Sequence, residues 1–170
     1  MQLRADGPDV WYAEGIEAFV GPEEIAFLKE RASASARQRS RICLHENVES
    51  VVHEMVIVHG RSCYVRPARH PHKRETMTVL EGTATAVFFD DVGAITSTRQ
   101  LSANGDKMWR VPPNTWHGLV ITSDWLVFYE VSKGPWQPAA SEYPGWAPDQ
   151  HEPAAGPFLE SLRSRVDAHV

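Results

Sequence analysis

The sequence predicts a single all-β domain that carries a short helix near its N-terminus and a helical tail at its C-terminus. A chain of 170 residues can build one domain with a substantial core and is too short for two ordinary domains. Hydrophobic residues make up 42% of the chain and charged residues 23%, as in soluble globular proteins. Between residues 50 and 131, short segments rich in Val, Ile, Thr and aromatic residues are separated by Gly, Pro, Asn and Asp. This texture is typical of a sandwich, a closed barrel or a double-sheet jelly roll.

The first predicted element is a helix over residues 22–36. The segment opens with Pro22 and two glutamates, which suit a first helical turn because proline lacks only an N–H that would be unpaired there, and acidic groups favour the positive end of the helix dipole. Ile25, Phe27 and Leu28 follow at roughly helical spacing. We therefore expect one short helix before the β-rich region.

Seven segments with strand-like composition follow, and their spacing suggests successive antiparallel strands. They cover residues 51–59, 75–82, 83–90, 94–101, 108–111, 116–121 and 125–131. The sequence DDVG at 90–93 supplies the acidic residues and the glycine that a tight hairpin needs where φ becomes positive. We therefore expect a hairpin between the third and the fourth segment.

The C-terminal part changes character again. Residues 133–157 are dense in Pro, Gly and Ala, which cannot continue a sheet and should run over the surface. Residues 157–170 return to helical spacing through Phe158, Leu162 and Val166. The sequence thus divides into three parts. Residues 1–36 form an N-terminal extension with the short helix, residues 37–135 a β-barrel domain, and residues 136–170 a Pro-rich loop and a helix that pack on the barrel.

Charge and composition exclude several classes of partner. The formal net charge of −5 and the pI near 5.9 argue against a protein that binds nucleic acid through overall phosphate attraction. No apolar run approaches 18 residues and the N-terminus lacks the pattern of a secretory signal, so we expect no membrane partner and a cytoplasmic location. Cys43 and Cys63 are interpreted as buried thiols.

Three side chains that can bind a metal fall at strand ends. Glu75 opens a predicted strand, His70 lies shortly before it, and His117 follows VPPNTW, whose prolines and Asn114 force a bend. Two imidazoles and one carboxylate are the composition of an open site for Fe(II), Mn(II) or a related ion. The remaining coordination positions would hold water or substrate.

At this point the sequence resembles the cupins. Their first motif is G, five residues, H-x-H, three or four residues, E, six residues and G, and their second is G, five residues, P-x-G, two residues and H. The matching stretches here are PARHPHKRETMTVLEG (67–82) and GDKMWRVPPNTWH (105–117). Further segments look like one branch, the cupin fold metalloproteins of the WbuC type, among them RQRSRICLHE (37–46), VHEMVIV (52–58), WLVFYEVSKGPW (125–136) and YPGWAP (143–148).

The resemblance implies a single cupin domain, a double-stranded β-helix or jelly-roll barrel, with one divalent transition metal that can be Fe, Mn, Zn or Ni. The register that keeps Glu75 in place puts His70 at the second histidine of the motif and Ala68 at the first, so one ligand is missing. We expect His70, Glu75 and His117 to bind the metal more weakly than four ligands would. His72 is an alternative replacement ligand, although Pro71 separates it from His70. Asn114 replaces a motif glycine, and asparagine tolerates the left-handed turn required there.

The charge is unevenly distributed. Residues 37–74 hold eight basic and three acidic side chains, a local charge of +5, which leaves −10 for the rest of the chain. Arginine matches carboxylate and phosphate groups, so we expect Arg41, Arg66 and Arg69 to attract a small anionic ligand to the cavity. His53 shares a strand face with Met55 and lies near that cavity if this face lines the barrel. His45, His59, His151 and His169 are expected at the surface.

These features predict a cupin-fold metalloprotein with a site for an anionic ligand. The resemblance implies a carbohydrate-related ligand and a role in bacterial surface-polysaccharide metabolism. Glu130 or Tyr129 would act as the acid or base if the protein is an enzyme. One alternative is a non-catalytic ligand-binding or regulatory cupin with a degenerate metal site. Another is a metal-free sugar epimerase or isomerase that uses His70 or His117 with Tyr64 or Tyr129. Jelly rolls often cover exposed strand edges by pairing subunits, so a homodimer is expected.

Overall fold

The computed structural model describes residues 1–169. Its strands, in chain order, are β1 Gln2–Ala5, β2 Val10–Glu14, β3 Arg39–Cys43, β4 Val52–Gly60, β5 Glu75–Glu81, β6 Thr83–Phe89, β7 Ile95–Ser102, β8 Met108–Val111, β9 His117–Ile121 and β10 Trp125–Lys133. Its helices are α1 Pro22–Ala34, a 3-10 turn Pro138–Ala140 and α2 Ala155–Asp167. Neither α-helix has the length and hydrophobicity that a membrane crossing requires.

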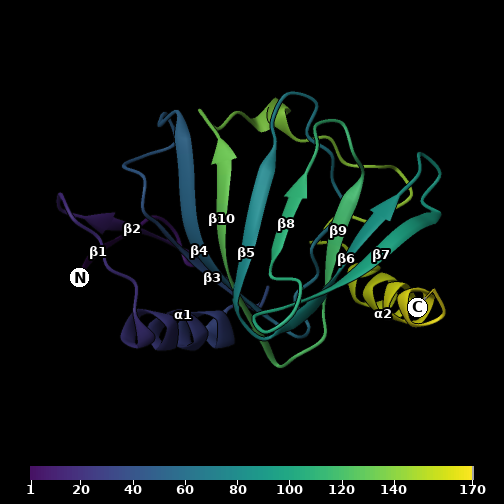
Figure 1. Ribbon diagram of the computed structural model, residues 1–170, viewed down its shortest axis with the longest axis horizontal. Helices are drawn as coiled ribbons and strands as arrows, with labels where there is room; N and C mark the ends of the chain where they lie inside the picture. The colour runs from purple at the N-terminus through teal and green to yellow at the C-terminus, as the bar shows by residue number, and fades with distance from the viewer. Residues whose placement is uncertain (170) are drawn as a thin grey trace.

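The strands form two facing sheets, with orders β1-β2-β3-β4-β10-β5-β8 and β7-β6-β9 (Figure 1). All pairs are antiparallel except β2 with β3. Strand β10 lies between β4 and β5, so the centre of the large sheet pairs segments that are far apart in sequence. The predicted strands are antiparallel, as expected, but among the seven of them only β6 and β7 pair with their neighbour in sequence. This non-sequential pairing between two sheets is the double-sheet arrangement that the resemblance implies.

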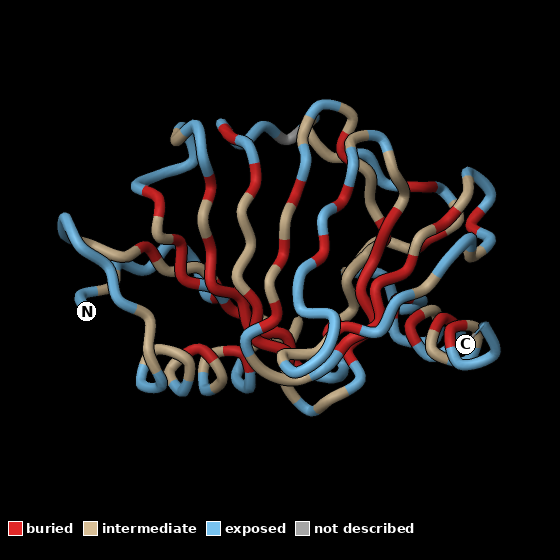
Figure 2. The backbone as a smooth tube through the Cα atoms, viewed as in Figure 1, coloured by how far each residue is buried: buried red, intermediate tan, exposed pale blue. Residues whose placement is uncertain are grey.

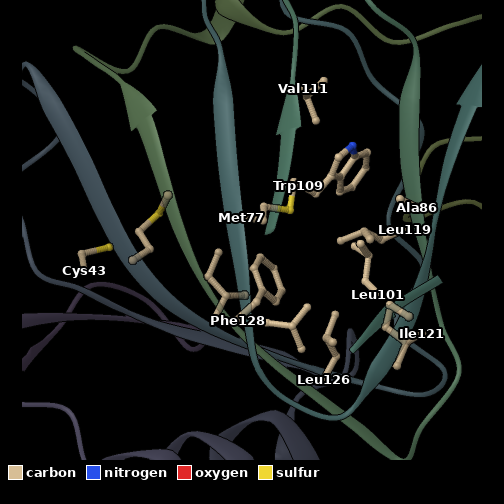
Figure 3. Close-up of a cluster of buried hydrophobic side chains, with 14 of the residues drawn as sticks. Cys43, Met77, Ala86, Leu101, Trp109, Val111, Leu119, Ile121, Leu126 and Phe128 are labelled. Carbon is tan, nitrogen blue, oxygen red and sulfur yellow. The ribbon is translucent and has the colours of Figure 1, made fainter. Parts of the chain in front are cut away.

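The main core lies between the two sheets. Figure 3 shows Met77, Trp109, Leu119 and Phe128 directed into the space between them, and the tube in Figure 2 is mostly buried where the sheets converge. Inward-facing residues alternate with outward-facing ones along each strand, as strand geometry requires. The core closes one end of the sandwich and leaves polar side chains on the same inner faces toward the other end.

The two helices cover the outer faces. Helix α1 packs through Leu28 and Ala32 on Ile42 and Val58 of the large sheet. Helix α2 lies against the small sheet on the far side of the molecule, through residues that include Leu162 (Figure 1). Each helix thus buries an apolar stripe that would otherwise face water.

Three turns hold the sheets in place. Gly82, with φ of 81°, joins β5 of one sheet to β6 of the other, and a Cβ there would collide with the carbonyl oxygen of Trp125. Asn114 has φ of 56°, which confirms that it takes the left-handed conformation of the motif glycine it replaces. In the predicted β6–β7 hairpin, the Asp90 carboxylate accepts hydrogen bonds from the backbone N–H groups of Val92 and Ala94.

All seven predicted strands and both predicted helices are present, with ends that differ by a few residues. Strands β1, β2 and β3 were not predicted from the sequence. Strand β3 alternates arginines with Ser40 and Ile42, so its inward face is charged and the usual apolar signal is absent. Strand β2 extends the large sheet from within residues 1–36. Cys43 and Cys63 are buried free thiols, as predicted.

Candidate functional site

His70, Glu75 and His117 meet in one buried cluster. Glu75 is the first residue of β5 and His117 the first of β9, while His70 lies on the loop before β5. The His70 Nε2 atom is 3.2 Å from Glu75 Oε1, and the His117 Nε2 atom is 3.5 Å from Glu75 Oε2. One potential ligand atom from each residue lies within 4.8 Å of the others. Fold topology therefore brings together the three side chains that the sequence singled out.

The backbone around the cluster fixes the loop that carries His70. The N–H of Asn114 donates to the carbonyl oxygen of His70 at 2.8 Å, so the turn before β9 is tied to that loop. Ala68 and His117 exchange two backbone hydrogen bonds, both 3.0 Å long. Residues paired in this way place their side chains on the same face, and Ala68 accordingly lines the cavity beside His117.

The other ring nitrogens show how the imidazoles are oriented. His117 Nδ1 lies 2.9 Å from the carbonyl oxygen of Thr115, and His70 Nδ1 lies 3.3 Å from that of Ala140 and 3.0 Å from the Ser141 hydroxyl oxygen. The Thr115 carbonyl oxygen only accepts, so His117 Nδ1 carries a proton, whereas at His70 either Nδ1 donates to the Ala140 carbonyl oxygen or the Ser141 hydroxyl donates to Nδ1. Each Nε2 faces the Glu75 carboxylate, and a nitrogen and a carboxylate oxygen this close require a positive charge between them, from a metal ion or from a ring proton.

Lys73 also reaches the cluster, which the sequence analysis did not foresee. Its Nζ atom is 2.7 Å from Glu75 Oε1. Burial by itself would raise the pKa of Glu75, but hydrogen bonds from His117 and His70 and the charge of Lys73 outweigh it and hold that pKa below its ordinary value. Glu75 is therefore a carboxylate in contact with a resident cation.

His72 does not replace the missing ligand. The chain bends after Pro71, and His72 is exposed and outside the cluster. Lys73, which follows it, takes the inward direction instead. The position of Ala68 is therefore open on the wall of the cavity, next to His117.

The cluster opens into a cavity of about 630 Å³ between the sheets. Glu130 of β10 lines this cavity, and burial together with the charge of Glu75 raises its pKa to about 8. Tyr129 lies on the opposite face of the same strand, where its hydroxyl donates to Glu54 Oε1 at 2.5 Å. Adjacent residues of a strand point to opposite faces, so the prediction that Tyr129 acts at the site is wrong. Tyr64 also points elsewhere, since its hydroxyl donates to the Pro148 carbonyl oxygen.

Of the arginines predicted to hold an anion, Arg66 and Arg69 are already paired. Arg66 donates to Asp149 Oδ2 at 3.0 Å and to the carbonyl oxygen of Ala147 at 3.2 Å. Arg69 donates to Glu142 Oε2 at 2.6 Å and lies outside the cavity lining. Both side chains hold the Pro-rich loop of residues 136–150 against the barrel. Arg66 lines the cavity and Arg69 does not, and each guanidinium already has a carboxylate partner, so the prediction that they bind an anionic ligand stays a prediction for Arg66 and is wrong in its placement of Arg69 at the cavity.

Other predicted residues do line the cavity. Arg41 projects from β3 along its wall, and His53 shares the inward face of β4 with Met55, as the alternation indicated. The ring of His53 stacks on that of His45 at 4.2 Å between centroids. The prediction of a surface position is wrong for His45 and for His59, because both side chains are buried.

His59 and Arg39 are further cavity residues that the sequence analysis did not assign to the site. They lie directly opposite each other on β4 and β3. The signal that could have found them is the alternation Arg39-x-Arg41 opposite Ile57-x-His59, once RSRIC is recognised as a strand. His151 and His169 are exposed, as expected.

Comparisons with known proteins agree with this architecture. Residues 21–101 match the model of a family described as a Domain of unknown function (DUF6016). No curated protein sequence matches the chain. The fold is similar to that of an uncharacterised conserved protein with a double-stranded β-helix domain from Klebsiella pneumoniae, with a TM-score of 0.51 and 18% identity over 65% of this chain and 82% of that chain.

Two larger proteins are also similar. CapF, solved with the inhibitor 3-isopropenyl-tropolone, has a TM-score of 0.55 and 15% identity over 65% of this chain and 32% of its own. Oxalate decarboxylase from Bacillus subtilis, which has Mn(II) centres, has a TM-score of 0.45 and 20% identity over 55% of this chain and 24% of its own. The chain therefore spans about a third or less of these two proteins. With the topology described above, the likeness to the Klebsiella protein and to CapF shows that the chain has the double-stranded β-helix fold of cupins.

Proposed function

We propose that His70, Glu75 and His117 hold one divalent transition metal ion at the wall of a cavity that binds a small anionic ligand. The observation that carries this proposal is the convergence of two Nε2 atoms on a buried carboxylate, with each Nδ1 atom within hydrogen-bonding distance of a backbone carbonyl oxygen. Such orientation of the distal ring nitrogen is typical of metal-binding histidines.

The spacing of the ligand atoms supports the same proposal. Two ligands at about 2.1 Å from one ion are separated by about 3.0 to 3.5 Å when the angle between them is that of an octahedral or tetrahedral site. The separations of 3.2 Å from His70 Nε2 to Glu75 Oε1 and 3.5 Å from His117 Nε2 to Glu75 Oε2 fall in this range for a carboxylate that binds through both oxygens, and one ligand atom from each residue lies within 4.8 Å of the others. A bound ion would serve as a Lewis acid toward a carbonyl or hydroxyl oxygen.

The residues of the chain have separate tasks in this proposal. The Lys73 ammonium, close to Glu75, lies where it can orient an anionic group beside the cluster. Glu130 faces the same cavity and is the acid or base candidate that remains after Tyr129 is excluded. The carbohydrate-related ligand and the role in bacterial surface-polysaccharide metabolism are carried by the sequence resemblance and remain predictions of it.

Elemental analysis of protein purified without added metal or chelator tests the proposal. We expect a transition metal in the wild type and a loss of more than tenfold in His117→Ala and Glu75→Gln, because each substitution removes a ligand. His72→Ala is the matched control, since His72 is an exposed imidazole on the same loop and should leave metal content unchanged.

A second candidate function follows from the Lys73–Glu75 ion pair. A cation already in contact with the carboxylate suits a binding or regulatory protein whose metal site is degenerate. Equal and negligible metal in the wild type and in both ligand variants would favour this function and would overturn the metal proposal. Circular dichroism of each variant shows whether the fold is intact, so a loss of metal through unfolding can be recognised.

A further inference from the structure

The cavity contains a second group of charged residues, at the β3–β4 end of its wall. Arg39 and Arg41 lie on the inward face of β3, opposite His59 and Ile57 of β4. Within residues 1–169, neither guanidinium has a carboxylate oxygen within ion-pair distance, whereas the neighbouring Arg37 is paired with Asp9. Neither arginine is therefore in an ion pair within residues 1–169, although the Asp9 carboxylate, which is paired with Arg37, lines a side pocket together with them.

His59 is the second, independent sign of an unfilled site. Its side chain is buried, with 7% of the residue exposed, and its Nδ1 atom has no hydrogen-bond partner among the described residues. Its ring packs against the edge of Phe128, with 5.2 Å between centroids. Most buried polar side-chain atoms in proteins have a partner, so His59 keeps unused hydrogen-bonding capacity beside the cavity that it lines, although its Nδ1 atom has almost no accessible surface.

A side pocket of about 210 Å³ connects these groups. Arg39, Arg41 and His59 line both this pocket and the main cavity. Burial and the like charges of Arg37 and Arg41 lower the pKa of the half-buried Arg39, so the exposed Arg41 and the Asp9-paired Arg37 both repel it. An anion between them would remove this repulsion.

The position is distinct from the His70–Glu75–His117 cluster. On β10, Glu75 pairs with Ser132 and His59 pairs with Leu126, six residues away. At about 3.3 Å per residue, Arg39 and His59 lie about 20 Å from the level of Glu75 along the strand, and Arg41, opposite Ile57 and hence level with Phe128, lies about 13 Å from it. An ion held by Arg39 and Arg41 therefore does not touch the cluster, and its binding does not depend on a metal.

We propose that Arg39, Arg41 and His59 form a binding subsite for a doubly charged oxyanion, such as the phosphate group of a phosphorylated small molecule. The two guanidinium charges balance a dianion, and each guanidinium presents a planar pair of donors that fits two oxygens of phosphate or carboxylate. The neutral imidazole of His59 supplies a further donor without adding charge. A ligand that occupied this subsite and reached the cluster would be elongated, with its anionic group at the β3–β4 end.

Titration calorimetry with inorganic phosphate tests the subsite, on protein treated with chelator so that no metal can hold the anion. We expect saturable binding in the wild type that weakens at least tenfold in Arg39→Gln and in Arg41→Gln. Arg99→Gln is the matched control, because it removes the same charge at an exposed position of β7 outside the cavity and should leave the affinity unchanged. His117→Ala should also bind phosphate as the wild type does.

The outcomes separate this subsite from the metal proposal. Equal phosphate affinity in all variants, equal losses in Arg99→Gln and the two cavity variants, or a loss confined to His117→Ala would each overturn the subsite. Malonate, a dicarboxylate of the same charge, is titrated in parallel. Tighter binding of phosphate than of malonate identifies a phosphate subsite, and the reverse assigns the same arginines to a dicarboxylate. Binding of neither anion to the wild type overturns the inference.

Discussion

The two ends of the cavity have opposite unmet charges. At one end, the Nε2 atoms of His70 and His117 face the Glu75 carboxylate, and the Lys73 ammonium also reaches this carboxylate. At the β3–β4 end, two arginines lie beside an imidazole, and no carboxylate of the described chain pairs with them. The first end suits a cation and the second an anion, although strands of the same large sheet contribute to both.

The difference shows how the same residue type acquires opposite roles. The imidazoles of His70 and His117 lie next to a carboxylate, whereas burial and the charges of Arg39 and Arg41 lower the pKa of His59 to about 3. Likewise, Arg66 has a carboxylate partner and Arg39 has none. The partner across the cavity, and not the residue itself, decides whether a charged group supports the fold or is available to a ligand.

The largest expected effect is a loss of stability in Arg66→Ala, which distinguishes an arginine with a carboxylate partner from the arginines of β3 that have none. Arg66→Ala removes hydrogen bonds to Asp149 and to backbone carbonyls, so we expect the free energy of unfolding to fall by about 2 kcal/mol. Phosphate affinity should not change. Denaturant unfolding and calorimetry measure both quantities, with Arg99→Ala as an exposed control that should cost less than about 0.5 kcal/mol.

The opposite result for Arg66→Ala would contradict the distinction between paired and unpaired arginines. If phosphate affinity fell tenfold while stability stayed constant, the paired arginine at the rim, and not the unpaired ones on β3, would hold the anion.

A second substitution sharpens the description of the metal end. Ala68 faces the cavity beside His117, so Ala68→His places a third imidazole at the open position. We expect loss of bound metal to a chelator to slow by about tenfold, about 1.4 kcal/mol at equal association rates. His72→Ala should lose metal at the rate of the wild type. Faster loss in His72→Ala, without any gain in Ala68→His, would show that the ligand register is displaced by two residues.

The sequence was sufficient for much of the fold and for the cluster. The composition of the segments predicted strands β4 to β10. The spacing of the motifs placed His70, Glu75 and His117 near strand ends, and the topology of the sheets brings these ends together. Asn114 could be interpreted because a left-handed turn has a known residue preference. These features are local, or they follow a pattern with fixed spacing.

The remaining features depend on contacts that no local pattern encodes. The partners of Arg66 and Arg69 lie on a loop more than 70 residues away that has no periodicity, so their neutralisation was invisible in the sequence. The inward direction of Lys73 follows from a bend after Pro71. Arg39 and His59 became candidates only when β3 was seen to pair with β4, because its alternating arginines conceal the strand.

A third prediction concerns acid stability at the arginine end. In the unfolded chain His59 takes up a proton below pH 6.5, but in the fold it stays neutral down to pH of about 3. The unfolded state therefore binds more protons in this window. As the pH is lowered, the free energy of unfolding decreases by up to about 1.4 kcal/mol per pH unit because of this group. In phosphate-free buffer, the decline between pH 6.5 and 4 should be shallower in His59→Gln. Parallel declines would show that His59 is not held neutral.

The smallest expected effect tests whether the unpaired cations on β3 strain the fold. Arg39 is half-buried among like charges, so Arg39→Gln should raise the free energy of unfolding by up to about 1 kcal/mol in phosphate-free buffer. Arg37→Gln is the matched control two residues away. It leaves the buried Asp9 carboxylate without its partner and should destabilise the protein.

Added phosphate should narrow the gap between the wild type and Arg39→Gln, because a ligand that binds the folded state stabilises it in proportion to its affinity. Thermal unfolding with and without phosphate measures this change. If Arg39→Gln were destabilised like Arg37→Gln, and phosphate shifted both midpoints equally, Arg39 would be an ordinary structural residue and the two ends of the cavity would not differ in the way described.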